Sequence, residues 1–174
     1  MGISADVTEE AEVQQLMTEA MRKTARIDCL INLVGGFAMS RLSETEASVW
    51  SRMLSLNLTS AFLLSKEATH VMTKQGSGRI IHIAARAAVD PFPGAGAYIV
   101  SKSGLLALIK VLALELAGSG VKVNGVLPTT IDTPANRQSM PNADPNQWAK
   151  PEAIAALLVF LASDEADALN GALI

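Results

Sequence analysis

Short runs of apolar residues alternate with longer amphipathic segments along this chain. The runs at residues 27–34, 79–84 and 121–127 are rich in Ile, Leu and Val, which is typical of strands buried on both faces. The segments between them have the length and the polar boundaries of helices. We therefore predict strands at these runs and at residues 172–174, and helices at residues 8–25, 44–74, 95–117 and 151–162.

Capping and turn residues mark the ends of these elements. Thr8 precedes two acidic residues, so it is predicted to be the N-cap of the first helix. Asn57 marks a predicted bend in the second helix, and Gly118 ends the third. Because helices alternate with buried strands, the pattern predicts an α/β fold with a parallel sheet and right-handed crossovers. At 174 residues, we expect a single domain over residues 1–174.

Composition narrows the classes of partner. Hydrophobic residues make up 49% of the chain and charged residues 18%, and the net charge is −3 without a basic stripe. These values favour a folded protein and argue against a nucleic-acid partner. The longest apolar run, residues 153–162, is too short to span a bilayer, and no signal segment opens the chain. We therefore expect a cytoplasmic protein without a membrane partner.

Cysteine and histidine offer little metal or redox chemistry. Cys29 is the one cysteine, so no internal disulfide can form, and its place in an apolar run predicts an inert buried thiol. His70 and His82 are the two histidines, and neither has cysteines or acidic residues at ligand spacing. We expect no metal site.

Tyr98 and Lys102 are the most informative pair of residues. Their i, i+4 spacing places both side chains on one face of the predicted helix. A neighbouring ammonium favours phenolate, so we expect the pKa of Tyr98 to fall toward neutral pH, where a phenol transfers protons efficiently. The Y-x-x-x-K pattern is common by chance, and a surface pair is the alternative.

The segments around this pair resemble one family. Residues 27–36 resemble the fourth strand and the Asn-Asn-Ala-Gly turn of short-chain dehydrogenases/reductases, and residues 56–59 resemble the segment carrying their helix Asn. Residues 78–85 and 121–128 resemble strands five and six. The resemblance implies a Rossmann-type, doubly wound parallel sheet that is N-terminally truncated, with about strands 4 to 7 present. It further implies NAD or NADP as cofactor and a small-molecule carbonyl or alcohol as substrate.

The resemblance also implies roles for individual residues. Tyr98 would donate and accept the proton, Lys102 would lower its pKa and orient the ribose, and Asn57 would feed a water relay to Lys102. Asn57 has an alternative as a helix-bending residue, Asn32 as a residue that fixes its turn, and Thr133 as ordinary loop chemistry. The cofactor-binding residues that the resemblance implies are Asp6, Asn32, Gly35, Tyr98, Lys102, Pro128 and Thr133.

The chain departs from the family pattern at several positions. Ala85 stands where the family has a Ser that binds the substrate carbonyl, and losing one such donor typically costs about 10² to 10³ in turnover. Leu33 replaces the second Asn of the turn, and Thr129 replaces a Gly. The glycine-rich turn that binds pyrophosphate has no counterpart, and residues 1–7 resemble the end of strand three.

Two functions remain open at this point. The first is an NAD(P)-dependent oxidoreductase with weak or absent activity. The alternative is a non-catalytic truncated homologue that acts as a binding or assembly subunit. A misassigned start at Met1 would also explain the missing segment. Because strand 27–34 would form an uncovered apolar edge, we expect a homo-oligomer, with a rearrangement near this strand or poor solubility as the alternatives. The divergent segment 133–150 would determine the substrate.

Overall fold

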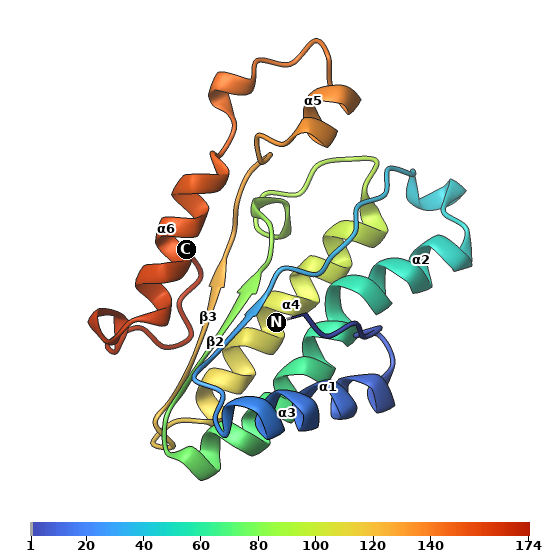
Figure 1. The fold of residues 1–174 in the computed structure, drawn as a ribbon. Coiled ribbons are helices and arrows are strands. Elements are labelled where there is room, and N and C mark those ends of the chain that lie inside the picture. The colour runs from blue at the N-terminus through green and yellow to red at the C-terminus, as the bar shows by residue number, and fades with distance from the viewer. Residues whose placement is uncertain (1) are drawn as a thin grey trace.

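Three parallel strands form the sheet of the computed structural model, which describes residues 2–174 (Figure 1). They are β1 (Cys29–Asn32), β2 (Gly78–Ile83) and β3 (Val121–Val126), in the spatial order β1-β2-β3. The register pairs Asn32 with His82 and His82 with Gly125, so all three strands end at the same edge. The predicted α/β fold with a parallel sheet is confirmed.

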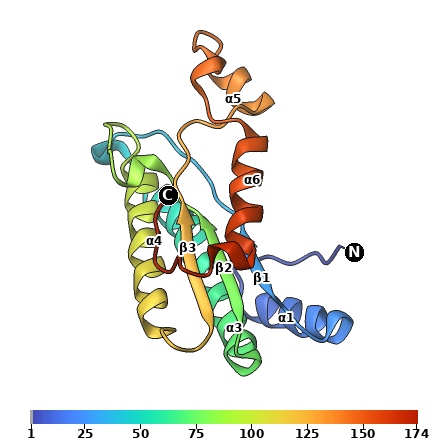
Figure 2. The ribbon, with the colours of Figure 1, turned by 90° about the vertical axis from the view of Figure 1, so that its left-hand side faces the viewer.

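Helices cover both faces of this sheet (Figure 2). One face carries α1, α3 and α4, and the other carries α6. Four short 3-10 turns lie at Leu42–Glu44, Arg86–Ala88, Pro145–Gln147 and Asp164–Ala166. The helices are α1 (Glu10–Thr24), α2 (Ala47–Leu54), α3 (Ser60–Gln75), α4 (Gly96–Glu115), α5 (Pro134–Ser139) and α6 (Pro151–Ala162).

Alternation along the strands divides the core into two clusters. Ile80 and Val123 face α1, α3 and α4, and they pack with the fully buried Ile109. Ile81 and Val126 point to the opposite face and pack against α6. Because successive strand residues point to opposite faces, one strand supplies both clusters. This double burial explains why the sequence shows continuous apolar runs rather than alternation.

The predicted second helix is a continuous helical run with one irregularity near the expected place. The helix α2, a π-helical turn at Ser55–Thr59 and α3 follow one another without a gap, and Asn57 lies buried inside the π turn. A π turn widens the helix locally, and such turns occur frequently at functional sites. The long helix is thus confirmed, although it begins at Ala47 rather than at residue 44, and the irregularity at Asn57 is a π turn.

Three other boundary predictions need correction. Glu9, not Thr8, occupies the N-cap of α1, because Thr8 donates both its amide and its hydroxyl to Asp6. Residues 172–174 form a single parallel bridge, Gly125 to Leu173, rather than a named strand. Residues 2–7 form no strand, and Met1 lies outside the described residues. The helix α5 was not predicted.

Among the described residues, α4 is the one helix long and apolar enough to cross a membrane by length and composition. Buried core helices of globular proteins pass the same test. Leu105, Ile109 and Ala113 are the buried positions of α4 that belong to the main core cluster. The apolar character of α4 is thus used, at least on this face, for packing inside the fold.

Gly120 lies where two turns meet below the sheet. Its φ is +81°, and a Cβ atom there would lie 1.9 Å from the carbonyl oxygen of Gly76. Gly76 ends α3 and Gly120 precedes β3, so their contact fixes how both strands enter the sheet. Gly118 has a similar φ of +82° but open space around its missing Cβ. Comparing substitutions at the two glycines therefore distinguishes the cost of a positive φ from the cost of a steric clash.

We expect Gly120→Ala to lower the free energy of unfolding by more than about 3 kcal/mol, because both turns must move. Gly118→Ala should cost only the left-handed backbone strain, about 1 kcal/mol. Urea denaturation of both variants measures this difference. Equal losses would contradict a steric role for Gly120.

Candidate active site

Asn57 holds the turn that follows β1. Its Oδ1 accepts a hydrogen bond from the Gly36 amide, and its Nδ2 donates to the Gly36 carbonyl, each at 3.0 Å. The same Nδ2 donates to Ser101 Oγ at 3.0 Å. Because Asn57 is 1% exposed, these bonds form away from water. One amide therefore connects the π turn, the turn after β1 and α4.

Lys102 places a buried charge beside this turn. Its Nζ donates to the carbonyl of Ile83 at 2.8 Å, at the end of β2, and the residue is 5% exposed. Desolvation lowers the pKa of Lys102 to about 8. A Cβ atom on Gly35 would lie 2.8 Å from Asn57 Oδ1 and 3.2 Å from Lys102 Nζ. Only glycine leaves this space next to the ammonium.

Tyr98 lies in the first turn of α4, one helical turn before Lys102. Its ring meets Phe37 edge to face, with ring centroids 4.9 Å apart. Its backbone carbonyl accepts from Ser101 Oγ, which links it to Asn57. Burial raises the pKa of Tyr98, so the predicted fall is wrong for this structure. The cause of this rise is desolvation of the phenol.

A buried polar chain supports the turn from inside the sheet. Asn32 Oδ1 accepts from the Val34 amide at 3.0 Å, and Asn32 Nδ2 lies 3.3 Å from His82 Nδ1. Ser65 Oγ of α3 lies 2.8 Å from His82 Nε2. Burial, followed by the charge of Lys102, lowers the pKa of His82 to about 4. His82 is therefore neutral near pH 7.

Ala85 continues β2 toward the site. It is 5% exposed with an extended backbone, and the next residue, Arg86, donates its amide to the Pro128 carbonyl at 3.0 Å. Pro128 therefore lies beside the segment that carries Ala85, and its cofactor role stays a prediction. The Ala85 side chain offers no hydrogen-bond donor at this point.

Asp6 and Thr133 are engaged in local contacts. The Asp6 carboxylate accepts from the Thr8 amide and hydroxyl, which lowers its pKa. Thr133 Oγ1 caps α5 by accepting from the Asn136 amide at 3.2 Å. Both residues therefore have structural roles in the chain as it stands, and their cofactor roles stay predictions.

Asp132 closes the base of the divergent segment 133–150. Its carboxylate pairs with Arg137 at 2.6 Å and with Lys150 at 2.7 Å, and these hydrogen bonds hold its pKa well below the usual range. A parallel bridge between Ile131 and Ala149 lies beside them. We call these contacts the Asp132 clasp. The segment that carries α5 leaves and returns to the fold through this clasp (Figure 1).

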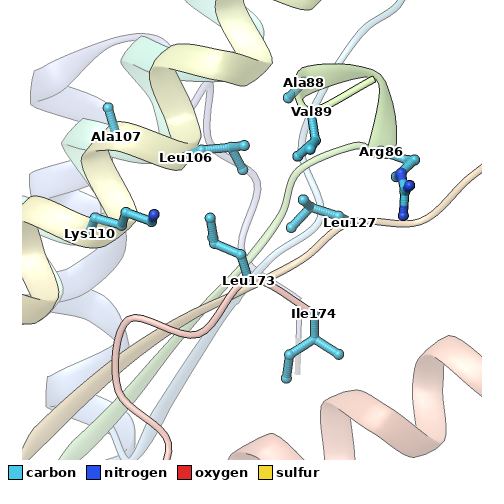
Figure 3. Close-up of a pocket in the computed structure, with 9 residues that line it drawn as sticks. All are labelled: Arg86, Ala88, Val89, Leu106, Ala107, Lys110, Leu127, Leu173 and Ile174. Carbon is cyan, nitrogen blue, oxygen red and sulfur yellow. The ribbon is translucent and has the colours of Figure 1, made fainter. Parts of the chain in front are cut away.

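A cavity of about 610 Å³ opens beside α4, further along the helix from Tyr98 and Lys102 (Figure 3). The Lys110 side chain points into it, whereas Arg86 is paired with Asp90. Neither Tyr98 nor Lys102 lines it, so this cavity is separate from the candidate site. Its lining residues are Arg86, Ala88, Val89, Leu106, Ala107, Lys110, Leu127, Leu173 and Ile174.

No group of three or more His, Cys, Asp or Glu side chains within residues 2–174 is arranged to hold a metal ion. Cys29 is half-buried in β1, where desolvation raises the pKa of its thiol to about 11. At neutral pH this cysteine is a thiol rather than a reactive thiolate.

Sequence reasoning did not assign Phe37, Ser65 or His82 to the site. His82 shares the face of β2 with the core residue Ile80, two positions before it. A histidine at an inward position of an apolar strand is a signal of a buried hydrogen-bonding partner. The helix residue that provides this partner, Ser65, could not be identified without the packing of α3 on the sheet.

Polar groups gathered beyond the carboxyl ends of parallel strands define a Rossmann-type α/β protein. Within this class, Tyr98, Lys102 and Asn57 are the residues that the sequence resemblance predicted as the active site of one family. A family model described as "Enoyl-(Acyl carrier protein) reductase" matches residues 1–174. The chain belongs to the short-chain dehydrogenase/reductase family.

Individual relatives agree with this assignment. The 3-oxoacyl-[acyl-carrier-protein] reductase of Synechocystis is 35% identical, over 97% of this chain and 70% of its own length. The "Inactive 2-(S)-hydroxypropyl-CoM dehydrogenase 2" of Xanthobacter autotrophicus is 32% identical, over 98% and 80%. A short-chain dehydrogenase/reductase structure from Burkholderia xenovorans superimposes with a TM-score of 0.90 at 31% identity, over 100% of this chain and 71% of that one.

Neutral His82 makes stability depend on pH. Its pKa in the folded chain, about 4, lies below the ordinary value of 6.5, so its contribution is present above pH 6.5 and is lost as the pH falls toward 4. When the pH falls from 7 to 5, we expect the unfolding free energy of the wild-type chain to drop by about 2 kcal/mol more than that of His82→Asn. Urea denaturation at each pH measures this, and parallel pH profiles would contradict it.

Proposed function

We propose that this chain carries the proton-transfer site of an NAD(P)-dependent oxidoreductase that interconverts a small alcohol and a carbonyl, with weak turnover. The observation that carries the proposal is the convergence of Asn57, Lys102 and Gly35, one helical turn from Tyr98. The family assignment supports the same reaction class.

The residues at the turn fit the nicotinamide end of such a cofactor. Gly35 lacks the Cβ that would fill the space beside Lys102 Nζ, which leaves a cradle for a sugar ring. Lys102 uses one of its three N–H groups on Ile83, so the others are available for ribose hydroxyls. The bound nicotinamide supplies the hydride. The sequence contains no G-x-G-x-x-G turn to hold the pyrophosphate.

Proton transfer is assigned to the Tyr98 hydroxyl. Burial keeps this phenol protonated at neutral pH, which suits donation to a developing alkoxide during carbonyl reduction. The ammonium of Lys102 stabilises the phenolate that remains. Asn57 keeps the turn and α4 in register, so that Tyr98 and Lys102 face the same space.

Ala85 accounts for the proposed weakness of turnover. A hydroxyl at this position would bind the carbonyl oxygen in the transition state, and the Ala85 methyl group cannot do so. We expect Ala85→Ser to raise the rate of NADPH-dependent reduction of small ketones and aldehydes by about 10² to 10³. The measurement is nicotinamide absorbance under saturating carbonyl, with Ala84→Ser as the matched control.

Cofactor binding is measured first on the same proteins. Titration with NADH and NADPH, followed by energy transfer from Trp50 and Trp148, gives the dissociation constant. Saturable binding with an active Ala85→Ser variant supports the proposal. Saturable binding without any gain from Ala85→Ser refutes the role of this position. The absence of binding up to millimolar cofactor refutes the oxidoreductase function for this chain.

A non-catalytic assembly subunit is the second candidate. Its supporting observation is the apolar edge formed by β1 and the residues that follow it, where Ile31 is 39% exposed, Leu33 67% and Val34 38%. One relative is itself named an inactive dehydrogenase. An exposed apolar strand edge favours pairing with another chain, so we propose a homo-oligomer formed through β1. A cytoplasmic location stays a prediction.

We expect Leu33→Glu to weaken self-association by at least about tenfold, because it places a charge on the proposed interface. Leu114→Glu is the matched control, since Leu114 is 78% exposed on α4. Light scattering over a micromolar concentration series measures the association. A monomeric wild-type chain, or dissociation caused by Leu114→Glu instead, contradicts the β1 interface.

A further inference from the structure

The turn at residues 33–36 is held at both ends by buried side chains. Asn57 holds its far end through both backbone groups of Gly36. Asn32 holds its near end by accepting from the Val34 amide. Between these two anchors, Gly35 passes next to the Lys102 ammonium. The position of Gly35 therefore depends on how firmly Asn32 is oriented.

We propose that His82 is a positioning residue that fixes the amide of Asn32 and, through it, the turn that faces the cofactor. This inference rests on the proposed function for the meaning of the turn. The hydrogen bonds from which it is argued do not depend on that function. The hydrogen-bonding partners of His82 are Asn32 and Ser65, and the contact with Asn32 is the one that leads to the turn.

The hydrogen bonds of this chain have one consistent direction. The Val34 amide can only donate, so the atom of Asn32 that receives it is the carbonyl Oδ1. The Nδ2 group of Asn32 must then donate to His82 Nδ1, which carries no proton. The proton of the neutral imidazole is left on Nε2, where it donates to Ser65 Oγ. One tautomer therefore satisfies all three side chains.

Burial makes this arrangement costly to disturb. Asn32 is 3% exposed, His82 is 0% exposed and Ser65 is 1% exposed. A buried donor or acceptor that loses its partner cannot turn to water, so each contact strongly constrains the next. The strand register also places Asn32 directly opposite His82, which sets the distance between them. The imidazole thus transmits the position of α3 to the turn.

Two substitutions of His82 by residues with a side-chain amide test the contacts of its two ring nitrogens one at a time. In His82→Asn, the side-chain amide reaches the place of Nδ1 and can still accept from Asn32. In His82→Gln, the longer side chain reaches the place of Nε2 and retains the contact with Ser65. Both variants remove the ring, so both lose similar packing. Only the Asn variant keeps the contact that the proposal requires.

Amide hydrogen exchange of Val34 and Gly36, followed by NMR, is the main measurement. We expect both amides to exchange at least about tenfold faster in His82→Gln than in His82→Asn. Equal acceleration in the two variants would mean that His82 only fills the core, which overturns the proposal. The NADPH dissociation constant should rise more for Gln than for Asn.

The wild-type chain offers a test that needs no variant. Long-range proton–nitrogen NMR of the His82 ring reports which nitrogen carries the proton. A proton on Nε2 is expected, and a proton on Nδ1 overturns the proposal. If the wild-type chain binds no cofactor, the proposed function fails. The ring tautomer and the exchange comparison still decide the role of His82.

Discussion

The contact on which the site depends is the pair of hydrogen bonds between the Asn57 amide and the backbone of Gly36. An Asn amide can donate and accept at once, so it can replace a neighbouring strand for one peptide group. It does so from a π-helical turn, which carries the side chain inward between α2 and α3. Without this contact both backbone groups of Gly36 would lose the partner that Asn57 provides. The arrangement of the site therefore depends on the π-helical turn that carries Asn57.

At the carboxyl ends of the strands, one buried charged group lies among neutral ones. Lys102 is the buried cation, and its pKa is lowered because the surrounding groups desolvate it. His82 is kept neutral by burial and by Lys102, so the interior holds one positive charge at most near this point. Desolvation also keeps the phenol of Tyr98 protonated. A bound anion or hydroxyl-rich group would meet an ammonium that has few other partners.

Much of the fold was predictable because it follows from local patterns. Continuous apolar runs gave the three strands, and the spacing of Tyr98 and Lys102 placed both on one face of α4. An irregularity at Asn57 was also predictable, whereas its form as a π-helical turn depends on packing. The raised pKa of Tyr98 and the link from His82 to Ser65 depend on burial. The apolar runs reveal that the strands are buried, but the partners that surround these two side chains come from distant segments.

The Asp132 clasp has a consequence for how this protein can change. A segment whose two ends are joined by the Asp132–Lys150 ion pair and the Ile131–Ala149 bridge is thermodynamically a loop that is already closed at its base. Doubling the length of such a loop costs only about 0.6 kcal/mol, because closure entropy grows with the logarithm of length. Residues between the ends can thus be exchanged or inserted while the sheet keeps its stability. Because of the clasp, the sequence of segment 133–150 can vary while the rest of the fold is kept.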